Sequence, residues 1–180
     1  MEDKLKVALI YGSTRPGRFC DTVAAWTAAQ LTKHGAFTVD LIDPAAVEDP
    51  AIRRQRLAQA DAFVIVTPEY NHGYPAPLKH LIDTAGSEWH AKPVAFVSYG
   101  GISGGLRAVE QLRQVFAEVH AVTMRDSVSF AGAWEQFDGA GALKEPERAE
   151  RSMTTMLKRL HWWATALRSA RETTPYLQTA

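Results

Sequence analysis

Short apolar runs that alternate with amphipathic segments constrain this 180-residue chain more than any other feature. The runs lie at 7–11, 37–42, 62–66, 94–98 and 121–124, the last continuing at 128–130. Runs of this length and composition are typical of strands buried on both faces. Helical spacing of apolar side chains predicts helices near 19–33, 52–60, 77–86, 106–119 and 145–167.

Strands that alternate with helices predict an α/β protein with a parallel sheet, right-handed crossovers and helices on both faces. Five strands in a chain of this length suit a doubly wound sheet of order 2-1-3-4-5. The sequence shows no repeat, linker or low-complexity tract, so we expect residues 1–180 to form one domain.

Composition excludes several classes of function. Twenty basic residues balance 20 acidic ones, which argues against a nucleic-acid binder or a protein that binds membrane surfaces through basic residues. No apolar stretch reaches the ~18 residues of a membrane span, and the polar start does not resemble a signal peptide. A single cysteine and no zinc-like spacing favour a reducing cytoplasm. Zero net charge also leaves little repulsion between copies, so self-association is expected.

The loop at 12–18 follows the first strand and reads Gly-Ser-Thr-Arg-Pro-Gly-Arg. Ligands of open parallel sheets bind beyond the carboxyl ends of the strands. A helix N-terminus, two hydroxyls and the guanidinium groups of Arg15 and Arg18 would suit a phosphate there. We expect the two arginines to be an unpaired positive pair. The loop matches neither a Walker A motif nor G-x-G-x-x-G, and the alternative is a plain connection with solvated arginines.

Two further loops leave the carboxyl ends of predicted strands. The first holds Glu69-Tyr70-Asn71-His72, which could line a flat ligand, and the second is the glycine loop at 100–105. The alternatives are tyrosines packed on the surface, a surface histidine, a Glu69 that only fixes the loop by hydrogen bonding, and a flexible glycine turn. We find no nucleophile elbow, metal-ligand pair or catalytic triad, so no catalytic or metal-binding side chain is predicted.

Three motifs together resemble those of the NADPH-dependent FMN reductase family, whose fold is flavodoxin-like. They are Gly-Ser-Thr-Arg-Pro-Gly-Arg at 12–18, Pro-Glu-Tyr-Asn-His-Gly at 68–73 and Ser-Tyr-Gly-Gly-Ile-Ser-Gly-Gly at 98–105. The resemblance spans about residues 5–130. It implies an FMN phosphate held by the first loop and a flavin ring bordered by the other two. The implied FMN-binding residues are Ser13, Thr14, Arg15, Arg18, Phe19, Pro68, Glu69, Tyr70, Asn71, His72, Ser98, Tyr99, Gly100, Gly101 and Gly104.

The resemblance also implies an enzymatic cycle. FMN would take a hydride from NADPH (or NADH) and then reduce a small acceptor such as a quinone, flavin or azo compound, in a ping-pong sequence. It further implies a homodimer, or a tetramer, in which the helices near 77–86 and 106–119 make the contact beside the flavin. Two alternatives are a flavodoxin-type electron carrier, which neutral charge, Arg15 and Arg18 oppose, and a binding protein that has lost FMN.

The chain departs from the family pattern at two places. Arg18-Phe19-Cys20-Asp21 stands where many members have Ser and Asn, and His72-Gly73 stands where many have Gly-Ser. Outside the motifs, we expect Cys20 to be a packing residue. Trp89 and Trp134 could shape an acceptor pocket, and one of the adjacent Trp162 and Trp163 should pack on the sheet while the other could meet a partner.

Overall fold

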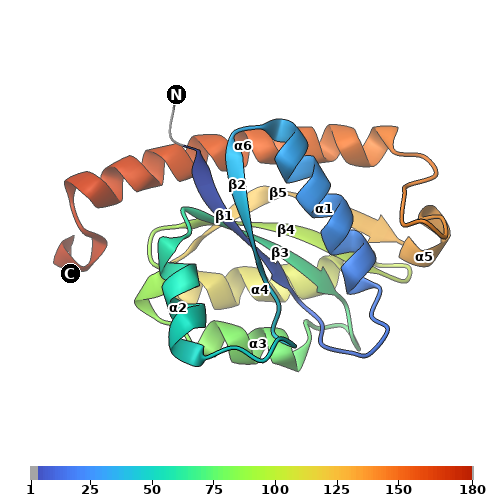
Figure 1. Ribbon diagram of the computed structural model, residues 1–180, viewed down its shortest axis with the longest axis horizontal. Coiled ribbons are helices and arrows are strands. Elements are labelled where there is room, and N and C mark those ends of the chain that lie inside the picture. Colours follow the sequence, from blue (N-terminus) through green and yellow to red (C-terminus); the bar gives the residue numbers. More distant parts are fainter. Residues whose placement is uncertain (1–3, 180) are drawn as a thin grey trace.

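A computed structural model describes residues 4–179 and shows one five-stranded sheet in which every adjacent pair is parallel. The strand order is β2-β1-β3-β4-β5, which confirms the predicted flavodoxin-like order (Figure 1). The strands are β1 (Leu5–Tyr11), β2 (Phe37–Ile42), β3 (Ala62–Pro68), β4 (Pro93–Gly100) and β5 (Val122–Ala131).

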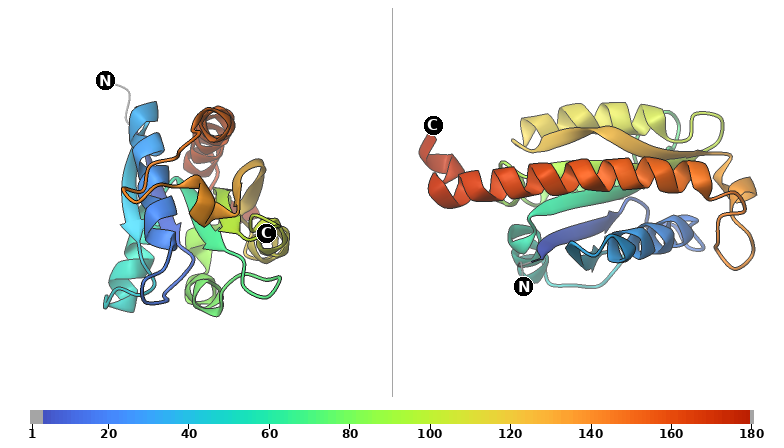
Figure 2. Two further views of the ribbon diagram at one scale, coloured as in Figure 1. Left: turned by 90° about the vertical axis from the view of Figure 1, so that its right-hand side faces the viewer. Right: turned by 90° about the horizontal axis from the view of Figure 1, so that it is seen from above.

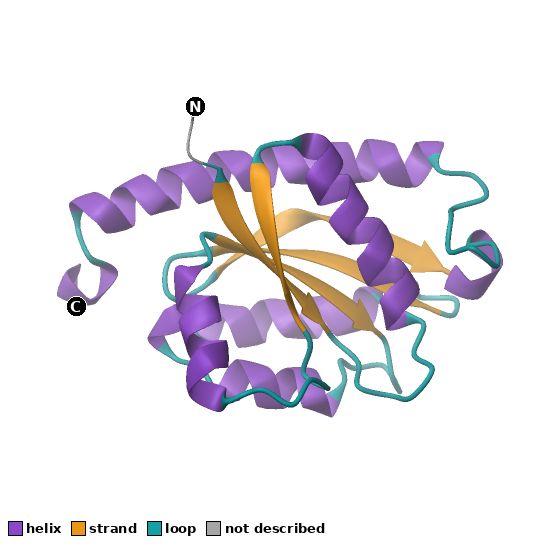
Figure 3. Ribbon diagram, in the orientation of Figure 1, coloured by secondary structure: helices purple, strands orange, loops and turns teal. Residues whose placement is uncertain are grey.

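Helices cover both faces of the sheet (Figures 1 and 3). One face carries α1 (Cys20–His34) and α6 (Glu147–Thr173). The other carries α2 (Pro50–Gln59), α3 (Ala76–Asp83) and α4 (Leu106–Glu118). Short helical turns complete the fold at α5 (Ala133–Gln136), η1 (Ser87–Trp89) and η2 (Tyr176–Thr179).

Alternating side chains of the central strands divide the hydrophobic core into two layers. Val64 and Val66 of β3 pack toward α1 and α6, whereas Phe63 and Ile65 pack toward α3 and α4. Every residue of β3 and β4 is buried. A strand buried on both faces reads as a continuous apolar run, which is why these two were visible in the sequence.

β5 corrects one sequence expectation. Its strand runs unbroken from Val122 to Ala131 and passes through Arg125 and Asp126, where the apolar pattern predicted a break. An edge strand tolerates charged side chains that a central strand would not. Asp126 also finds a cation, because Arg159 of α6 lies 2.5 Å from its carboxylate.

The tryptophan pair of α6 corrects a second expectation. Trp162 and Trp163 are 63% and 37% exposed, so neither is buried against the sheet. Leu160 and Ala164 take the inward positions instead. None of the helices within residues 4–179 is long and apolar enough to cross a membrane.

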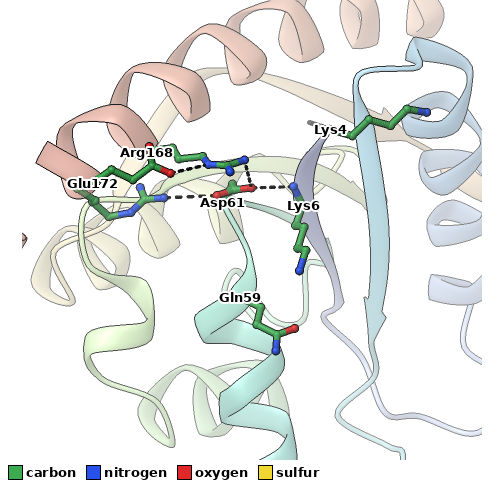
Figure 4. A pocket seen from close by; sticks show the side chains of 7 residues that line it. Lys4, Lys6, Gln59, Asp61, Arg168 and Glu172 are labelled. Atoms are coloured by element: carbon green, nitrogen blue, oxygen red, sulfur yellow. Dashed lines mark hydrogen bonds and ion pairs between the residues drawn. The ribbon is translucent and has the colours of Figure 1, made fainter. Parts of the chain in front are cut away.

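An ion cluster fastens α6 to the amino end of the sheet, away from the loops described below (Figure 4). The Asp61 carboxylate accepts a 2.9 Å hydrogen bond from the backbone N–H of Lys6. It also lies 3.6 Å from the guanidinium of Arg168 and 3.7 Å from that of Arg171. The cluster lines a hollow of about 370 Å³.

Candidate functional site

Three loops meet at the carboxyl edge of the sheet because β1, β3 and β4 are parallel neighbours. They follow these strands at 12–19, 69–75 and 101–105. The hydroxyls of Ser13 and Tyr70 are 2.8 Å apart and join the first loop to the second. Ser103 donates a 2.7 Å hydrogen bond to the Glu69 carboxylate and joins the second loop to the third. The structure therefore brings the three predicted segments into one site.

The first loop crosses β3 so closely that its first residue has to be glycine. The Gly12 N–H donates a 2.7 Å bond to the Val66 carbonyl, and a Cβ at Gly12 would lie 2.7 Å from that same oxygen. Beyond it, the backbone N–H groups of Thr14, Gly17 and Phe19 donate to no acceptor within residues 4–179. Such free donors before a helix N-terminus form an anion cradle.

Arg15 is the exposed cation of this loop. Its guanidinium carbon lies 3.6 Å from the centroid of the Tyr70 ring, which is a cation–π contact. The guanidinium has no carboxylate partner among the ion pairs of the described chain. Arg15 is thus placed to meet an anion at the cradle.

Arg18 contradicts the expectation of an unpaired pair of arginines. Its side chain is 10% exposed and forms ion pairs with Asp43 at the end of β2 and with Asp21 in α1. It also donates to the Ser13 carbonyl. The Asp43 hydrogen bond is the main cause that raises the pKa of Arg18, and the same bond lowers the pKa of Asp43. The positive charge of Arg18 is therefore neutralised, and its side chain shapes the loop.

A tight turn carries the second loop. Tyr70 and Gly73 exchange backbone hydrogen bonds of 2.9 and 3.1 Å around two central residues. Those residues, Asn71 and His72, have φ angles of 50° and 70°, which is the pattern of a type I′ turn. The turn points both side chains to solvent, and His72 Nε2 lies 3.0 Å from a guanidinium nitrogen of Arg107.

Glu69 fixes the second loop to α4, in agreement with the alternative that it holds the loop by hydrogen bonding. Gly105 at the helix start has no capping side chain, and Glu69 replaces one by accepting the backbone N–H of Arg107 at 3.1 Å. Its other oxygen lies 2.5 Å from Arg107 Nε. Burial is the largest influence on the Glu69 carboxyl and opposes ionisation. The bonds from Ser103 and Arg107 together outweigh it and lower the pKa.

The glycine loop has a tightly packed half and an open half. The Ser98 and Ser129 hydroxyls both donate to the Gly104 carbonyl, at 2.8 and 2.9 Å. A Cβ at Gly105 would lie 2.8 Å from that of Ser98. At Gly101, by contrast, a Cβ would meet no atom within 4 Å, and Ile102 beside it is exposed. The open half is where a ligand can approach the backbone.

Several predicted site residues lie beneath the accessible surface. These buried residues are Ser13, Pro68, Ser98, Tyr99, Gly100 and Gly104. Tyr99 supports the first loop, because its ring lies 6.0 Å from that of Phe19. Cys20 is fully buried next to it, which confirms a packing role, and burial raises the pKa of its thiol.

Three residues of the site lie outside the predicted motifs: Asp43, Arg107 and Gln111, whose side-chain amide donates a 3.0 Å hydrogen bond to the His72 carbonyl. Asp43 directly follows a strand that ends at the same edge, and Arg107 lies in the first turn after the glycine loop. Both positions could therefore have been predicted to lie at the site. Trp89 is buried between Phe63 and Phe116 and donates to the Ile82 carbonyl, so it does not line this site. Trp134 is exposed on α5, and its role at an acceptor pocket stays a prediction.

The arrangement suits a flat anionic ligand. One end offers backbone donors and Arg15, while Tyr70, Asn71 and the open glycine backbone border the rest. Within residues 4–179 no three His, Cys, Asp or Glu side chains gather to hold a metal ion.

Comparison with known proteins gives a family match and several relatives. The family model described as NADPH-dependent FMN reductase matches residues 5–135. A fission yeast (Schizosaccharomyces pombe) NAD(P)H-dependent FMN reductase is 38% identical over 130 residues, which cover 61% of this chain and 64% of that protein. A Pseudomonas aeruginosa NAD(P)H-dependent FMN reductase is 31% identical and is covered over its full length, with 93% of this chain.

Quinone reductases and solved flavoenzymes are also similar. A Solanum tuberosum NAD(P)H:quinone oxidoreductase is 36% identical over 112 residues, 58% of this chain and 57% of that protein. The chain thus spans less than two thirds of the yeast and potato relatives. The flavoenzyme NAD(P)H:(acceptor) oxidoreductase from Paracoccus denitrificans has the same fold, with a TM-score of 0.72, 20% identity and coverage of 89% of this chain and 98% of that one.

Proposed function

Because this chain belongs to the NADPH-dependent FMN reductase family, we propose that it is an FMN-dependent NAD(P)H oxidoreductase that reduces a small-molecule acceptor. One observation carries the proposal. The loops after β1, β3 and β4 are tied together by Ser13–Tyr70 and Glu69–Ser103 into a single site with an anion cradle at one end.

The residues present fit FMN. The free N–H groups of Thr14, Gly17 and Phe19, with the Arg15 guanidinium, match a phosphate of roughly −2 charge. Tyr70 and Asn71 would border the flavin on one side, and the backbone at 100–102 on the other. Pro68, Ser98, Tyr99 and Gly104 would support these contacts from below, and Arg18 would act through the shape of the loop.

When bound, FMN supplies the hydride acceptance from NAD(P)H and the electron transfer to the second substrate. The chain's own part is to bind and orient. Arg15 neutralises the phosphate, and the Glu69–Arg107 bonds hold the turn at 70–73 at a fixed distance from α4. Backbone N–H groups near Gly101 would stabilise negative charge on the flavin ring when FMN is bound. Because no acid–base dyad is required, we propose no catalytic side chain.

The acceptor and the assembly belong to the same proposal. Relatives named as quinone oxidoreductases support a quinone as the acceptor. We propose a homodimer in which α3 and α4 of a second copy cover the site, because both helices adjoin its loops and Ile102 and Leu106 are exposed there. A free, buried Cys20 supports a reducing compartment such as the cytoplasm.

An absorbance spectrum of the purified, FMN-loaded protein tests the function. We expect a flavin spectrum that bleaches when NADPH or NADH is added without oxygen and returns when a quinone is added. A protein that takes up no FMN would favour the binding-protein alternative. A flavin that stays oxidised with both nicotinamides would favour the electron carrier.

A further inference from the structure

A groove of about 640 Å³ lies at the amino edge of the sheet, between α6 and the starts of β4 and β5. We call it the α6 groove. In Figure 2 the C-terminal end of α6 and the turn that follows it lie beside the start of β5. The loops of the proposed FMN site lie at the opposite edge, and the eight residues of β4 between the two edges span about 26 Å at about 3.3 Å per residue. The α6 groove is therefore separate from the proposed FMN site.

Most of the wall of the α6 groove is apolar and is built from small side chains. Ala166 and Ala170 of α6 lie one helical turn apart on one side, and Ala91 and Val122 lie at the starts of the two strands. Small side chains leave room for a flat ring between the helix and the strands, and the Tyr176 ring also borders this space. The volume falls within the range of about 300–1,000 Å³ that is typical of sites for small organic ligands. Size and lining therefore suit a ligand with an aromatic ring.

Arg171 lines the α6 groove, and its hydrogen bonding is incomplete. Its side chain is only 19% exposed. Of its five N–H donors, one makes a hydrogen bond within residues 4–179, from Nη1 to the Ala91 carbonyl at 2.6 Å. Nη2 lies 3.7 Å from Asp61, a carboxylate that also pairs with Arg168. A guanidinium buried with so few acceptors provides binding for a carboxylate, which can take two of its N–H groups at once.

A second buried cation lies close to Arg171. Lys92 is 5% exposed and donates to the Leu57 and Ala58 carbonyls, at 3.0 and 2.8 Å, and it forms no ion pair in the described part of the chain. Burial, and after it the positive charge of Arg171, lower the pKa of Lys92 to about 8. Burial is also the main cause that lowers the pKa of Arg171. An anion bound beside Arg171 would reduce the repulsion between these two cations, so the local charge favours an anionic ligand.

Further polar groups gather around Ala91. The Nδ1 atom of His90 is buried and has no hydrogen-bond partner in the described part of the chain. The centroid of the His90 ring lies 4.9 Å from that of His120 and 5.5 Å from that of Tyr176. His120 and Tyr176 both line the α6 groove, and His120 Nδ1 lies 2.9 Å from the Tyr176 hydroxyl. Polar side chains thus converge at the end of the groove that Arg171 occupies.

The backbone at this end of the α6 groove is held in a fixed conformation. Ala91 and His120 have φ angles of 50° and 58°, and the Ala91 N–H donates a 2.8 Å bond to the His120 carbonyl. Residues other than glycine adopt such angles rarely, and they keep them where the surrounding structure fixes the backbone, as it does at ligand sites. The polar end of the groove is therefore formed before any ligand binds.

We propose that the α6 groove is a binding site for a small aromatic carboxylic acid. The carboxylate accepts hydrogen bonds from the donors of Arg171 that have no acceptor in the described chain, and the ring lies against Ala166 and Ala170. The guanidinium offsets the cost of removing the carboxylate from water, and burial of the ring adds the hydrophobic contribution. The site does not depend on bound FMN, because no residue of the groove belongs to the three loops at the opposite edge.

Calorimetric titration with naphthoate and with its neutral amide, naphthamide, tests the role of charge. The two probes have the same ring and nearly the same shape, and they differ in charge. FMN is supplied in excess, so that a flat probe does not bind in place of the flavin. We expect naphthoate to bind with a Kd below about 1 mM, and naphthamide to bind at least about tenfold more weakly. Arg171→Gln should abolish the difference between the two probes, because the glutamine side chain carries no charge.

A matched pair of variants on α6 locates the binding site. Ala170→Leu fills the α6 groove, whereas Thr165→Leu adds the same side chain at an exposed position that lines a different hollow. Both positions are exposed, so both variants should fold, which the circular dichroism spectrum checks. We expect Ala170→Leu to weaken naphthoate binding at least about tenfold and Thr165→Leu to leave it unchanged. Absence of naphthoate binding at about 1 mM, equal affinity for acid and amide, or equal naphthoate affinity of the two leucine variants overturns the proposal.

Discussion

The two arginines of the first loop differ in exposure and in ion pairing, although they lie only three residues apart. Arg15 is exposed over the Tyr70 ring and has no carboxylate partner in the described chain. Arg18 is buried beneath the loop by Asp43, Asp21 and the Ser13 carbonyl. A planar guanidinium holds its five N–H donors in a rigid fork that can give a carboxylate two parallel bonds, whereas the donors of lysine share a single nitrogen. We therefore assign Arg15 to the proposed binding surface and Arg18 to the structure that holds the loop.

This division predicts opposite phenotypes for the two positions. Arg18→Lys should lower the free energy of unfolding by about 2–3 kcal/mol, because Asp43 loses its forked partner. Arg15→Gln should change stability by less than about 1 kcal/mol and weaken FMN binding about tenfold. Denaturant unfolding and FMN titration separate the two effects. Equal losses of stability in both variants would contradict the division.

Residue types in the site were more predictable than their roles. Ser13, Arg15 and Tyr70 could be placed together because the ends of parallel strands meet. The Asp43–Arg18 pair could not, since its members are 25 positions apart and only the packing of β2 beside β1 brings them together. The burial of Ser98 and Tyr99 could not be predicted either, because a side chain at a strand end can point toward the site or toward the core.

At the scale of elements, the turn at 70–73 stores strain beside the site. A type I′ turn requires positive φ at both central residues, and histidine adopts it less readily than glycine or asparagine. His72→Val should therefore destabilise the protein by about 1–2 kcal/mol, because a β-branched side chain clashes in this region. His72→Asn loses the same contact with Arg107 but fits the turn, so its melting temperature should stay near that of the native protein. If the two variants melt together, the strain is not at position 72.

The glycine loop makes a second prediction at this scale. Gly105→Ala places a Cβ 2.8–2.9 Å from Ser98 and Tyr99 at a φ of 83°, so we expect a loss of about 3 kcal/mol or failure to fold. Gly101→Ala meets open space and should keep native stability while weakening FMN binding, because its methyl group occupies the ligand's side of the loop. Thermal unfolding without FMN and FMN titration measure the two effects. Native FMN affinity in Gly101→Ala would place the ligand elsewhere.

The elements themselves were largely predictable. Buried strands such as β3 and β4 are visible in the sequence as continuous apolar runs. The end of the helix predicted at 19–33 is also confirmed, because Gly35 ends α1 in the left-handed conformation that glycine adopts easily. The break expected in β5 was wrong, because an edge strand that exposes Arg125 lacks the apolar signal. The expectation that one of the two tryptophans of α6 packs on the sheet was also wrong, because hydrophobicity predicts burial whereas their positions on the helix leave both side chains exposed.

At the scale of the whole molecule, two carboxylates connect the site to the sheet. Asp43 ties the end of β2 to the first loop, and Glu69 ties the end of β3 to α4. The Arg18 hydrogen bond is the main cause that lowers the pKa of Asp43. For Glu69, burial is the largest influence and is outweighed by bonds from Ser103 and Arg107, so the pKa is lowered as well. Both groups thus bind a proton less readily in the folded chain than in the unfolded one.

The sign of the pH dependence follows from that difference. A carboxyl with a lowered folded pKa contributes stability above its unfolded pKa, here 3.8 for Asp43 and 4.5 for Glu69, and loses it as the pH falls toward the folded value. Asp43→Asn and Glu69→Gln should each be about 1–3 kcal/mol less stable than the native protein at neutral pH. The deficit should shrink below about pH 4.5, because the native protein then loses the same contribution. Urea unfolding across this range measures it, with Glu118→Gln on the exposed end of α4 as the control. A deficit that stays constant down to pH 3 would show that these carboxylates stabilise the loops by shape and not by charge.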